Sequence, residues 1–354
     1  MDFQQGEQER ENGARIAKIL ATFMDRVEAM ELADVPAARG ILLQMQAALA
    51  AEDVGRALDD QGAWPQAIAN GLDVAKVSTS LFLALQATRQ CAMIAGGGPH
   101  DRIGAVALTE PGGPRAASVR LAGPPWRLNG RKAFVTNGPV ADVLAVFAAA
   151  DGREVACVIP ADSPGVTRGP RIAMPGLNGL TVCDIEFSDV DVQPEHIIEF
   201  AGKPNPRERY VLDADLTAAF ACVGLMHRVL GAAMAHASQH ERGGRPVLKY
   251  QEVGFKLAEM LTATHAADLL AMRATWMALT GNPEAATLVR CARVFCAENA
   301  ERVAIGAMQV AAGQGYVAGG LFERAWRDVR GLAVAGTTLE VARMAIADEL
   351  LGRV

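Results

Sequence analysis

The sequence predicts an α+β fold built from three consecutive domains, at residues 1–103, 104–200 and 207–354. In the first and third ranges, apolar residues recur with the 3.6-residue period of helices that bury one face. The middle range instead holds short apolar or alternating runs separated by Pro and Gly, a pattern typical of a small antiparallel β-barrel or sandwich. We therefore expect a helical domain, a β-domain and a second helical domain, in that order.

The first domain is expected to contain several amphipathic helices. Residues 14–28, 35–51 and 73–87 have helical spacing, and Gly and Pro residues separate them. A glycine-rich break at residues 96–99 then ends the helical pattern.

The middle domain is expected to contain short strands and one clear hairpin. Strands are expected at residues 119–121, 143–147, 155–159 and 182–187. Asn129-Gly130 lies between two further apolar runs, and both residues tolerate the positive φ angles of a two-residue turn, so we expect a β-hairpin centred there. A linker at residues 202–206 follows.

The third domain is expected to contain long helices. The first is expected over residues 212–240 and the second over 249–279, with Gly281 just beyond its last turn as a helix-ending residue. Asn282 suits the start of a further helix that runs to about residue 312, because its side chain accepts hydrogen bonds from the first helical N–H groups.

Composition excludes several classes of protein. The chain has 354 residues, of which 51% are hydrophobic, enough to build more than one core. Its net charge of −6 argues against a nucleic-acid-binding protein, which needs a basic face. The polar, acidic first residues do not resemble a signal peptide, and the apolar run at 140–150 is too short to cross a bilayer. We therefore expect a cytoplasmic protein that does not enter membranes.

Neither the cysteines nor the histidines have metal-ligand spacing. The six cysteines contain no Cys-x-x-Cys pair and are predicted to be buried thiols of a reducing compartment rather than disulfides. His236 and His240 lie one helical turn apart, but no third ligand is near in the sequence, so no metal site is expected.

Two stretches of the middle domain carry the strongest functional signal. An apolar run ends in Thr-Glu-Pro-Gly at residues 109–112, and such a turn frees backbone N–H groups at the tip of a strand. The second stretch, residues 128–137, places the aromatic Phe134 two residues before the hydroxyl of Thr136. A flavin needs an apolar surface for its ring and hydrogen-bond donors for its edge. Taken singly, each stretch is also compatible with an ordinary β-turn.

Together with other fragments in the same order, these stretches resemble acyl-CoA dehydrogenases along nearly the whole chain. The additional fragments are Gly176-Leu177-Asn178-Gly179, the strand ending at Phe187-Ser188-Asp189-Val190, the Lys256-Leu257-Ala258-Glu259-Met260 segment, Gln309 to Tyr316, Arg327-Asp328-Val329-Arg330 and Gly336-Thr337.

The resemblance implies the acyl-CoA dehydrogenase fold, with a C-terminal four-helix bundle that forms the oligomer. It also implies FAD as cofactor, an acyl-CoA thioester as substrate and electron-transfer flavoprotein as electron acceptor. In this chemistry a carboxylate removes the α-proton while the β-hydride goes to flavin N5. The residues expected to bind the cofactor by this resemblance are Leu108, Thr109, Phe134, Thr136, Arg242, Gln309, Gly313, Gly315 and Thr337.

The sequence departs from the family at the catalytic base. In most members the base is the Glu of a Y-E-G-T segment, but Ala335 stands there in this chain, and a methyl group cannot accept a proton. Some members carry the Glu near the start of the first C-terminal helix, where this chain has Ala214 between Asp213 and Asp215. Either Asp is a candidate base, and Glu340 is a third. Alternatively, the two Asp residues are first-turn acids that favour the helix dipole.

Two further motifs are altered. The Ser that normally follows the Thr-Glu-Pro turn is absent, and Gly243 replaces the Phe of the R-x-x-F-G motif. In the family the Arg of that motif reaches the FAD pyrophosphate of a neighbouring subunit. Here Arg242 or Arg245 is left for this contact, since a guanidinium matches phosphate bidentately. A solvated turn is the alternative.

Three functional hypotheses follow. The chain is an FAD-dependent acyl-CoA dehydrogenase with a displaced base, or it is a non-catalytic subunit that completes the site of a heteromeric enzyme. The second hypothesis resembles heterotetrameric bacterial acyl-CoA dehydrogenases, in which a Glu-containing homologue is the partner. The third hypothesis is a flavin-fold protein with other chemistry, such as an oxygen-using relative, or a purely structural binding protein.

Overall fold

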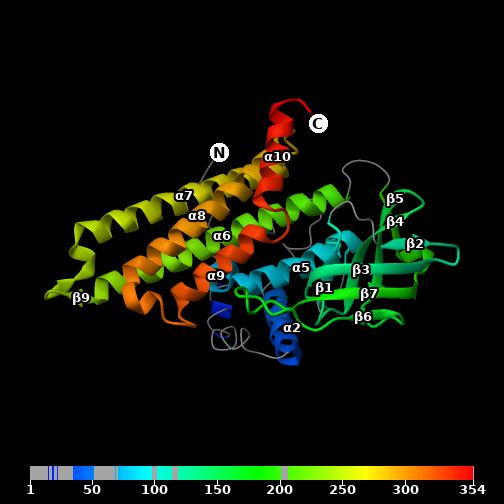
Figure 1. Cartoon of the computed structure of the whole chain (residues 1–354), viewed down its shortest axis with the longest axis horizontal. Helices are drawn as coiled ribbons and strands as arrows, with labels where there is room; N and C mark the ends of the chain where they lie inside the picture. The colour runs from blue at the N-terminus through cyan, green and yellow to red at the C-terminus, as the bar shows by residue number, and fades with distance from the viewer. Residues whose placement is uncertain are drawn as a thin grey trace.

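The computed structural model describes residues 35–51, 71–97, 102–113, 119–200 and 206–353, together with Arg15, Lys18, Ile19, Thr22 and Ile68. The helix expected at residues 14–28 and the linker at 202–206 lie largely outside these residues. Along the long axis of the molecule, a bundle of long helices occupies one end and the β-domain occupies the other (Figure 1).

The helices that the structure describes in the N-terminal part are α2 (Val35–Ala51), α4 (Leu72–Val77) and α5 (Thr79–Ala95). The expectation of one helix over residues 73–87 is wrong, because Ser78 adopts an extended conformation (φ −149°, ψ 116°) and breaks it. The Ser78 hydroxyl accepts a hydrogen bond from the Leu81 N–H at 3.2 Å and thereby caps α5. At its other end α5 stops at Gly96, which has the left-handed φ of 77°.

One sheet forms the β-domain, in the strand order β6-β7-β3-β2-β4-β5-β8, with β1 paired to β4. Most pairs are antiparallel, as expected, and β4 additionally runs parallel to β1 and β2. Its interior is an apolar cluster that includes Leu128, Leu144 and Ile185. The strands are β1 (Gly104–Ala107), β2 (Arg120–Ala122), β3 (Arg127–Thr136), β4 (Val143–Ala150), β5 (Arg153–Pro160), β6 (Val166–Arg168), β7 (Val182–Asp191) and β8 (Ile197–Glu199).

The hairpin expected at Asn129-Gly130 is wrong. These residues lie inside β3, where Asn129 pairs with Arg120 of β2, and the chain turns earlier, at residues 123–126. Gly130 uses its positive φ of 131° at a register shift between β3 and β7 instead of in a turn. There the Asn129 side chain accepts a hydrogen bond from the Asp189 N–H at 2.8 Å. A bulge and a turn thus use the same residue types.

Two contacts join the β-domain to the helices. The buried Asn137 side chain donates to the carbonyl oxygens of Ala84 in α5, at 2.8 Å, and of Gly104 in β1, at 3.2 Å. The loop before β7 contacts the C-terminal domain, where the Leu177 N–H donates to the Asp328 carboxylate at 2.5 Å. The orientation of the β-domain is therefore set by both helical parts.

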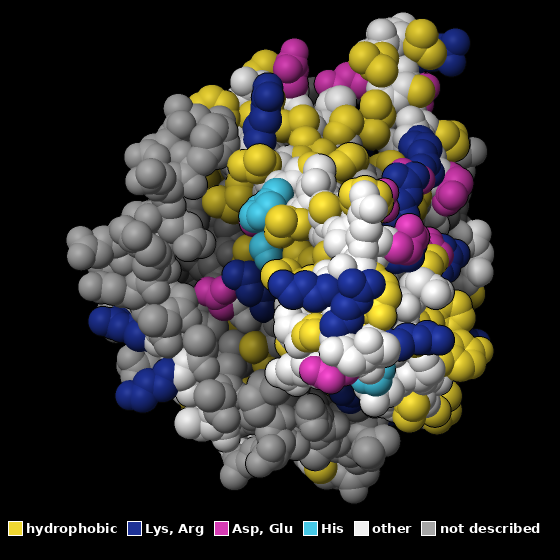
Figure 2. All heavy atoms as spheres, turned by 90° about the vertical axis from the view of Figure 1, so that its left-hand side faces the viewer, with side chains coloured by type: hydrophobic (Ala, Val, Ile, Leu, Met, Phe, Trp, Pro, Cys, Tyr) yellow, Lys and Arg dark blue, Asp and Glu magenta, His cyan; other side chains and the backbone are white. Residues whose placement is uncertain are grey.

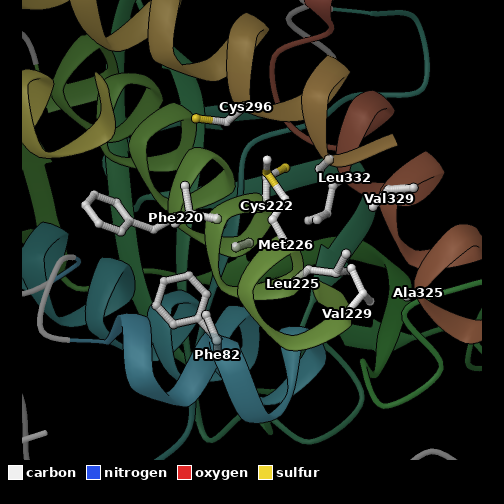
Figure 3. Close-up of a cluster of buried hydrophobic side chains, with 14 of the residues drawn as sticks. Phe82, Phe220, Cys222, Leu225, Met226, Val229, Cys296, Ala325, Val329 and Leu332 are labelled. Atoms are coloured by element: carbon white, nitrogen blue, oxygen red, sulfur yellow. The ribbon is translucent and has the colours of Figure 1, made fainter. Parts of the chain in front are cut away.

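The C-terminal domain contains five helices and a short hairpin of β9 (Glu241–Arg242) and β10 (Arg245–Pro246). The helices are α6 (Pro206–Gln239), α7 (Gln251–Leu279), α8 (Ala285–Gly315), α9 (Leu321–Val334) and α10 (Leu339–Leu350). The end of α7 is as expected, with Gly281 at φ 63°, and the Asn282 side chain accepts the Glu284 N–H at 2.9 Å before α8. In the core, Phe82 of α5 lies beside Phe220 and Met226 of α6, and Leu332 of α9 lies on the other side of α6 (Figure 3).

By length and composition alone, α6 is apolar enough to cross a membrane, the one such helix in the part of the chain that the structure describes. It packs against α4, α7 and α8, and 61% of its most apolar window is buried inside the protein. The core of the bundle therefore accounts for its apolar side chains.

Candidate functional site

The end of β1 and the middle of β3 bring the first group of expected cofactor residues together. Leu108 is half-buried and Thr109 is exposed. The Ala133 N–H donates to the Thr109 carbonyl at 2.8 Å. The buried Lys132 ammonium donates to the Leu108 carbonyl at 3.1 Å and to the Glu110 carboxylate at 2.6 Å. Burial lowers the pKa of Lys132, while the Glu110 carboxylate opposes that effect. These hydrogen bonds therefore hold the Thr-Glu-Pro turn against β3.

Phe134 lies on a β-bulge. The pairing of β3 with β7 shifts between Lys132 and Val135, so that Ala133 and Phe134 together lie opposite the single residue Asp184. Phe134 has a positive φ of 53° and its side chain is 61% exposed. An exposed aromatic ring held in a conformation that bulky residues rarely adopt is more typical of a binding surface than of a core. Thr136, also expected at the site, is half-buried two residues further on.

The second group of expected cofactor residues lies far from the first within one chain. Arg242 is exposed in the β9–β10 hairpin, at the end of the bundle opposite the β-domain (Figure 1). Gln309, Gly313 and Gly315 belong to the last turns of α8, which ends toward the same side. Figure 2 looks onto this end and shows Lys and Arg side chains gathered on it. One chain therefore does not bring the two groups together.

The last turns of α8 carry a backbone feature that the sequence did not indicate. Ala312 has φ 51° and ψ −133°, non-helical values in a region that glycine tolerates and other residues rarely adopt. Gly315 is buried, and a Cβ atom there would lie 2.5 Å from the Met308 carbonyl oxygen. A close backbone approach thus requires glycine at 315, whereas Gly313 is exposed with open space beside it.

Asp213, the first candidate base, is fully buried in a closed ion pair. Its carboxylate accepts from the Arg89 guanidinium of α5 at 2.5 and 2.6 Å and from the Gln90 amide at 2.7 Å. The ion pair occupies both oxygens of this carboxylate and links α5 to α6, so the geometry does not favour Asp213 as a proton acceptor.

Asp215, the second candidate, lies in a different environment. It is 1% exposed, and neither of its carboxylate oxygens has a hydrogen-bond partner among the described residues. The Arg293 guanidinium is 3.9 Å away, between Nε and Oδ1. Burial raises the pKa of Asp215 to about 6, against the lowering effects of Arg293 and the Thr337 side chain.

Arg293, a residue that sequence reasoning missed, connects Asp215 with the turn that carries Ala335. Its Nη2 donates to the carbonyl oxygens of Leu332 at 2.6 Å, Ala335 at 3.1 Å and Thr337 at 3.2 Å. Its Nε and Nη1 are buried and have no hydrogen-bond partner among the described residues. Asp213 and Asp215, both expected near the base position, therefore have different surroundings. Asp213 pairs with Arg89, and only Asp215 lies next to the turn that carries Ala335. A sequence signal for the burial of Arg293 exists, because Val289, Cys296 and Ala297, three or four positions away on the same face of α8, are all apolar.

Glu340, the third candidate, is exposed in the first turn of α10. The six cysteines are free thiols; five are buried as predicted, whereas Cys291 is half-buried. Among the described residues, no group of three or more His, Cys, Asp or Glu side chains is arranged to hold a metal ion.

Comparison with known families matches two parts of the chain. Residues 105–190 match the acyl-CoA dehydrogenase middle domain, and residues 215–351 match the acyl-CoA dehydrogenase C-terminal domain. The chain is 33% identical over 264 residues to 3-(aryl)acrylate reductase of Clostridium sporogenes, covering 70% of this chain and 68% of that one. It is 31% identical to benzylmalonyl-CoA dehydrogenase of Aromatoleum aromaticum, covering 71% and 68%.

Solved structures of other proteins superpose on nearly the whole length of this chain. Butyryl-CoA dehydrogenase of Megasphaera elsdenii superposes with a TM-score of 0.86 at 25% identity, covering 99% of this chain and all of that one. A glutaryl-CoA dehydrogenase of Mycobacterium smegmatis in complex with FADH2 gives a TM-score of 0.84 at 19% identity, covering 98% and 95%.

Proposed function

Because the chain belongs to the acyl-CoA dehydrogenase family of flavoprotein oxidoreductases, we propose that it is an FAD-dependent enzyme that desaturates an acyl-CoA thioester. The observation that carries this proposal is the exposed Phe134 ring on β3, one residue after Ala133, whose N–H donates to the carbonyl of the Thr109 turn. FAD supplies the acceptor for the β-hydride at N5 when it is bound. The described residues fit this cofactor, because they offer an exposed aromatic face with a hydroxyl-bearing loop beside it.

We propose further that two chains complete each cofactor site. Phe134 and Thr109 lie in the β-domain, whereas Arg242 and Gly315 lie toward the opposite end of the bundle. A guanidinium at that end can contact the FAD pyrophosphate only of a second chain. The partner is another copy of this chain or a homologue that carries the Glu, and electron-transfer flavoprotein is the proposed electron acceptor. We place the protein in the cytoplasm.

The proposed base is Asp215. An α C–H beside a thioester is a weak acid, so its base works best in a dry site with a pKa near the working pH. Asp215 meets both conditions, whereas Asp213 is held by Arg89. Because Asp215 is 1% exposed, the reaction requires the Ala335–Thr337 turn to move away from it when substrate binds.

Anaerobic mixing of the FAD-loaded chain with acyl-CoA thioesters of increasing chain length tests this function. Bleaching of the flavin absorbance, with formation of the enoyl product, is the expected result. Asp215→Asn should keep FAD and lose bleaching. A wild-type chain that binds FAD but is never reduced by acyl-CoA contradicts the catalytic proposal and favours the role of a non-catalytic subunit.

A further inference from the structure

We propose that Asp184 is a positioning residue that fixes Phe134 as one wall of the flavin site. The inference rests on the proposed function, because the flavin ring is the group that Phe134 contacts. Asp184 lies on β7, in a strand that the sequence predicts but with no role assigned to it there, and it does not touch the cofactor in this proposal.

The bulge in β3 creates the need for such a residue. Where two residues of one strand lie opposite one residue of the next, the ladder leaves backbone groups unpaired. Here the bulge frees the N–H groups of Ala133 and Phe134, which face Asp184 alone. The Ala133 N–H donates to the Thr109 carbonyl at 2.8 Å, and the Phe134 N–H donates to Asp184 Oδ1 at 3.0 Å. Both freed donors are therefore used, one for each half of the flavin site.

The Asp184 carboxylate is itself held in place. Its other oxygen, Oδ2, accepts from the Arg131 guanidinium at 2.6 Å, so one carboxylate joins the bulge residue Phe134 to a residue of β3 that precedes the bulge. The Asp184 carbonyl accepts from the Gly169 N–H at 2.9 Å, which fixes the backbone beneath the carboxylate. The Phe134 N–H and the Arg131 guanidinium outweigh the effect of burial and lower the pKa of Asp184, so the carboxylate is charged at neutral pH.

Packing alone does not hold Phe134 in its unusual conformation. The side chain is 61% exposed, and a φ of 53° is unfavourable for a bulky residue. Local strain of this kind persists only where surrounding contacts determine it. The charge-assisted hydrogen bond from the Phe134 N–H to Asp184 is such a contact, since it acts on the residue whose backbone is strained.

Three variants separate this role from general stability. Asp184→Ala removes the acceptor, and Asp184→Asn keeps an oxygen that can accept the Phe134 N–H. Asp191→Ala is the matched control, because Asp191 is also a carboxylate of β7 that pairs with an Arg of β3, with Arg127 Nη1 at 3.1 Å, but it accepts no bulge N–H in the hydrogen bonds that the structure describes. We expect the Kd for FAD to rise about ten-fold in Asp184→Ala, the effect of losing one charge-assisted hydrogen bond. Asp184→Asn and Asp191→Ala should stay within about three-fold of wild type.

Two readouts do not depend on turnover. The circular dichroism of the bound flavin reports the environment of its ring, and it should change in Asp184→Ala but not in Asp191→Ala. Amide hydrogen exchange of peptide 131–136 should be slow in the wild-type chain without FAD and at least about ten-fold faster in Asp184→Ala. The wild-type exchange measurement needs no variant, so it tests the hydrogen bond even if Asp184→Ala fails to fold.

The outcomes distinguish the inference from the function on which it rests. If the wild-type chain binds no FAD under any condition, the proposed function fails, whereas the exchange measurement still tests the hydrogen bond. If FAD binds but Asp184→Ala and Asp191→Ala have equal Kd values, the inference is overturned. Fast exchange at Phe134 in the wild type, or an Asp184→Asn variant as weak as Asp184→Ala, overturns it as well.

Discussion

The Asp215–Arg293 pair makes a quantitative prediction about stability. Replacing Arg293 with Met removes the donor to three carbonyl oxygens and leaves the buried Asp215 carboxylate without the larger of its two charge partners, the other being Arg290. Breaking a buried pair by removing one partner costs about 3–5 kcal/mol. We therefore expect Arg293→Met to lower the free energy of unfolding by about that amount at pH 7.5.

The pH dependence follows from the raised pKa. A carboxyl whose pKa rises on folding binds its proton more tightly in the folded state, so its stabilising contribution is present at low pH and is lost as the pH rises through the folded-state value. For Asp215, a rise from 3.8 to about 6 corresponds to about 3 kcal/mol lost between pH 4 and pH 7. Asp215→Asn should not show this loss, and Arg293→Met should recover part of its deficit at pH 5.

Urea unfolding at one protein concentration measures these differences for the two single variants and the double variant. The double variant should be more stable than the sum of the single losses predicts, by about 1–3 kcal/mol, because the two side chains interact. Arg343→Met is the matched control, since Arg343 forms an exposed ion pair with Glu298 at 2.5 Å in the same bundle and should cost less than about 1 kcal/mol. A loss below about 1 kcal/mol for Arg293→Met, or full additivity, refutes this reasoning.

Three further changes have defined outcomes. Asp215→Asn should lower kcat/KM by about 10²–10⁴-fold while FAD stays bound, and the kcat/KM of the wild type should rise as the pH passes about 6. A wild-type kcat/KM that does not depend on pH, or an Asp215→Asn variant with full activity, contradicts Asp215 as the base. Ala312→Gly should raise the free energy of unfolding by about 1 kcal/mol, because glycine removes strain at φ 51° and an exposed methyl contributes little packing; a destabilised variant contradicts this. Thiol titration should find the half-buried Cys291 reactive first, since the other five thiols are buried away from the reagent, although burial raises the pKa of all six; equal rates for all six contradict the buried assignment.

Much of the fold could be predicted because its signals are local. The helix of α7 and the start of α8 follow from apolar spacing, Gly281 and Asn282, all within a few residues of one another. The hairpin prediction at Asn129-Gly130 is wrong because residues that tolerate unusual φ angles suit a bulge as well as a turn. Only the pairing of β3 with β7 determines that these residues form a bulge rather than a turn.

The candidate site could be predicted only in part, for a physical reason. Phe134 and Thr109 belong to short motifs, but their positions depend on Lys132, Asp184 and the bulge, which are contacts across strands. Arg293 and Asp215 are 78 positions apart in the sequence and meet only through the packing of α6 on α8. Separating Asp213 from Asp215 required the Arg89 contact, which no local pattern indicates.

The central claim is that two chains complete each FAD site, and FAD binding by mixed assemblies tests it most directly. Phe134→Ala damages the half in the β-domain, and Arg242→Ala damages the half at the opposite end of the bundle. In a dimer containing one chain of each kind, one site carries both changes and the other carries neither. Each variant alone should therefore bind little FAD, whereas purified mixed dimers should bind up to about half the wild-type amount.

The control is the doubly substituted chain assembled with Phe134→Ala, which has no intact site and should stay colourless. Recovery of flavin absorbance in the mixed dimers and none in the control is the result that the account predicts. Mixed dimers as colourless as the control, or an Arg242→Ala chain that binds FAD as tightly as wild type, would contradict it.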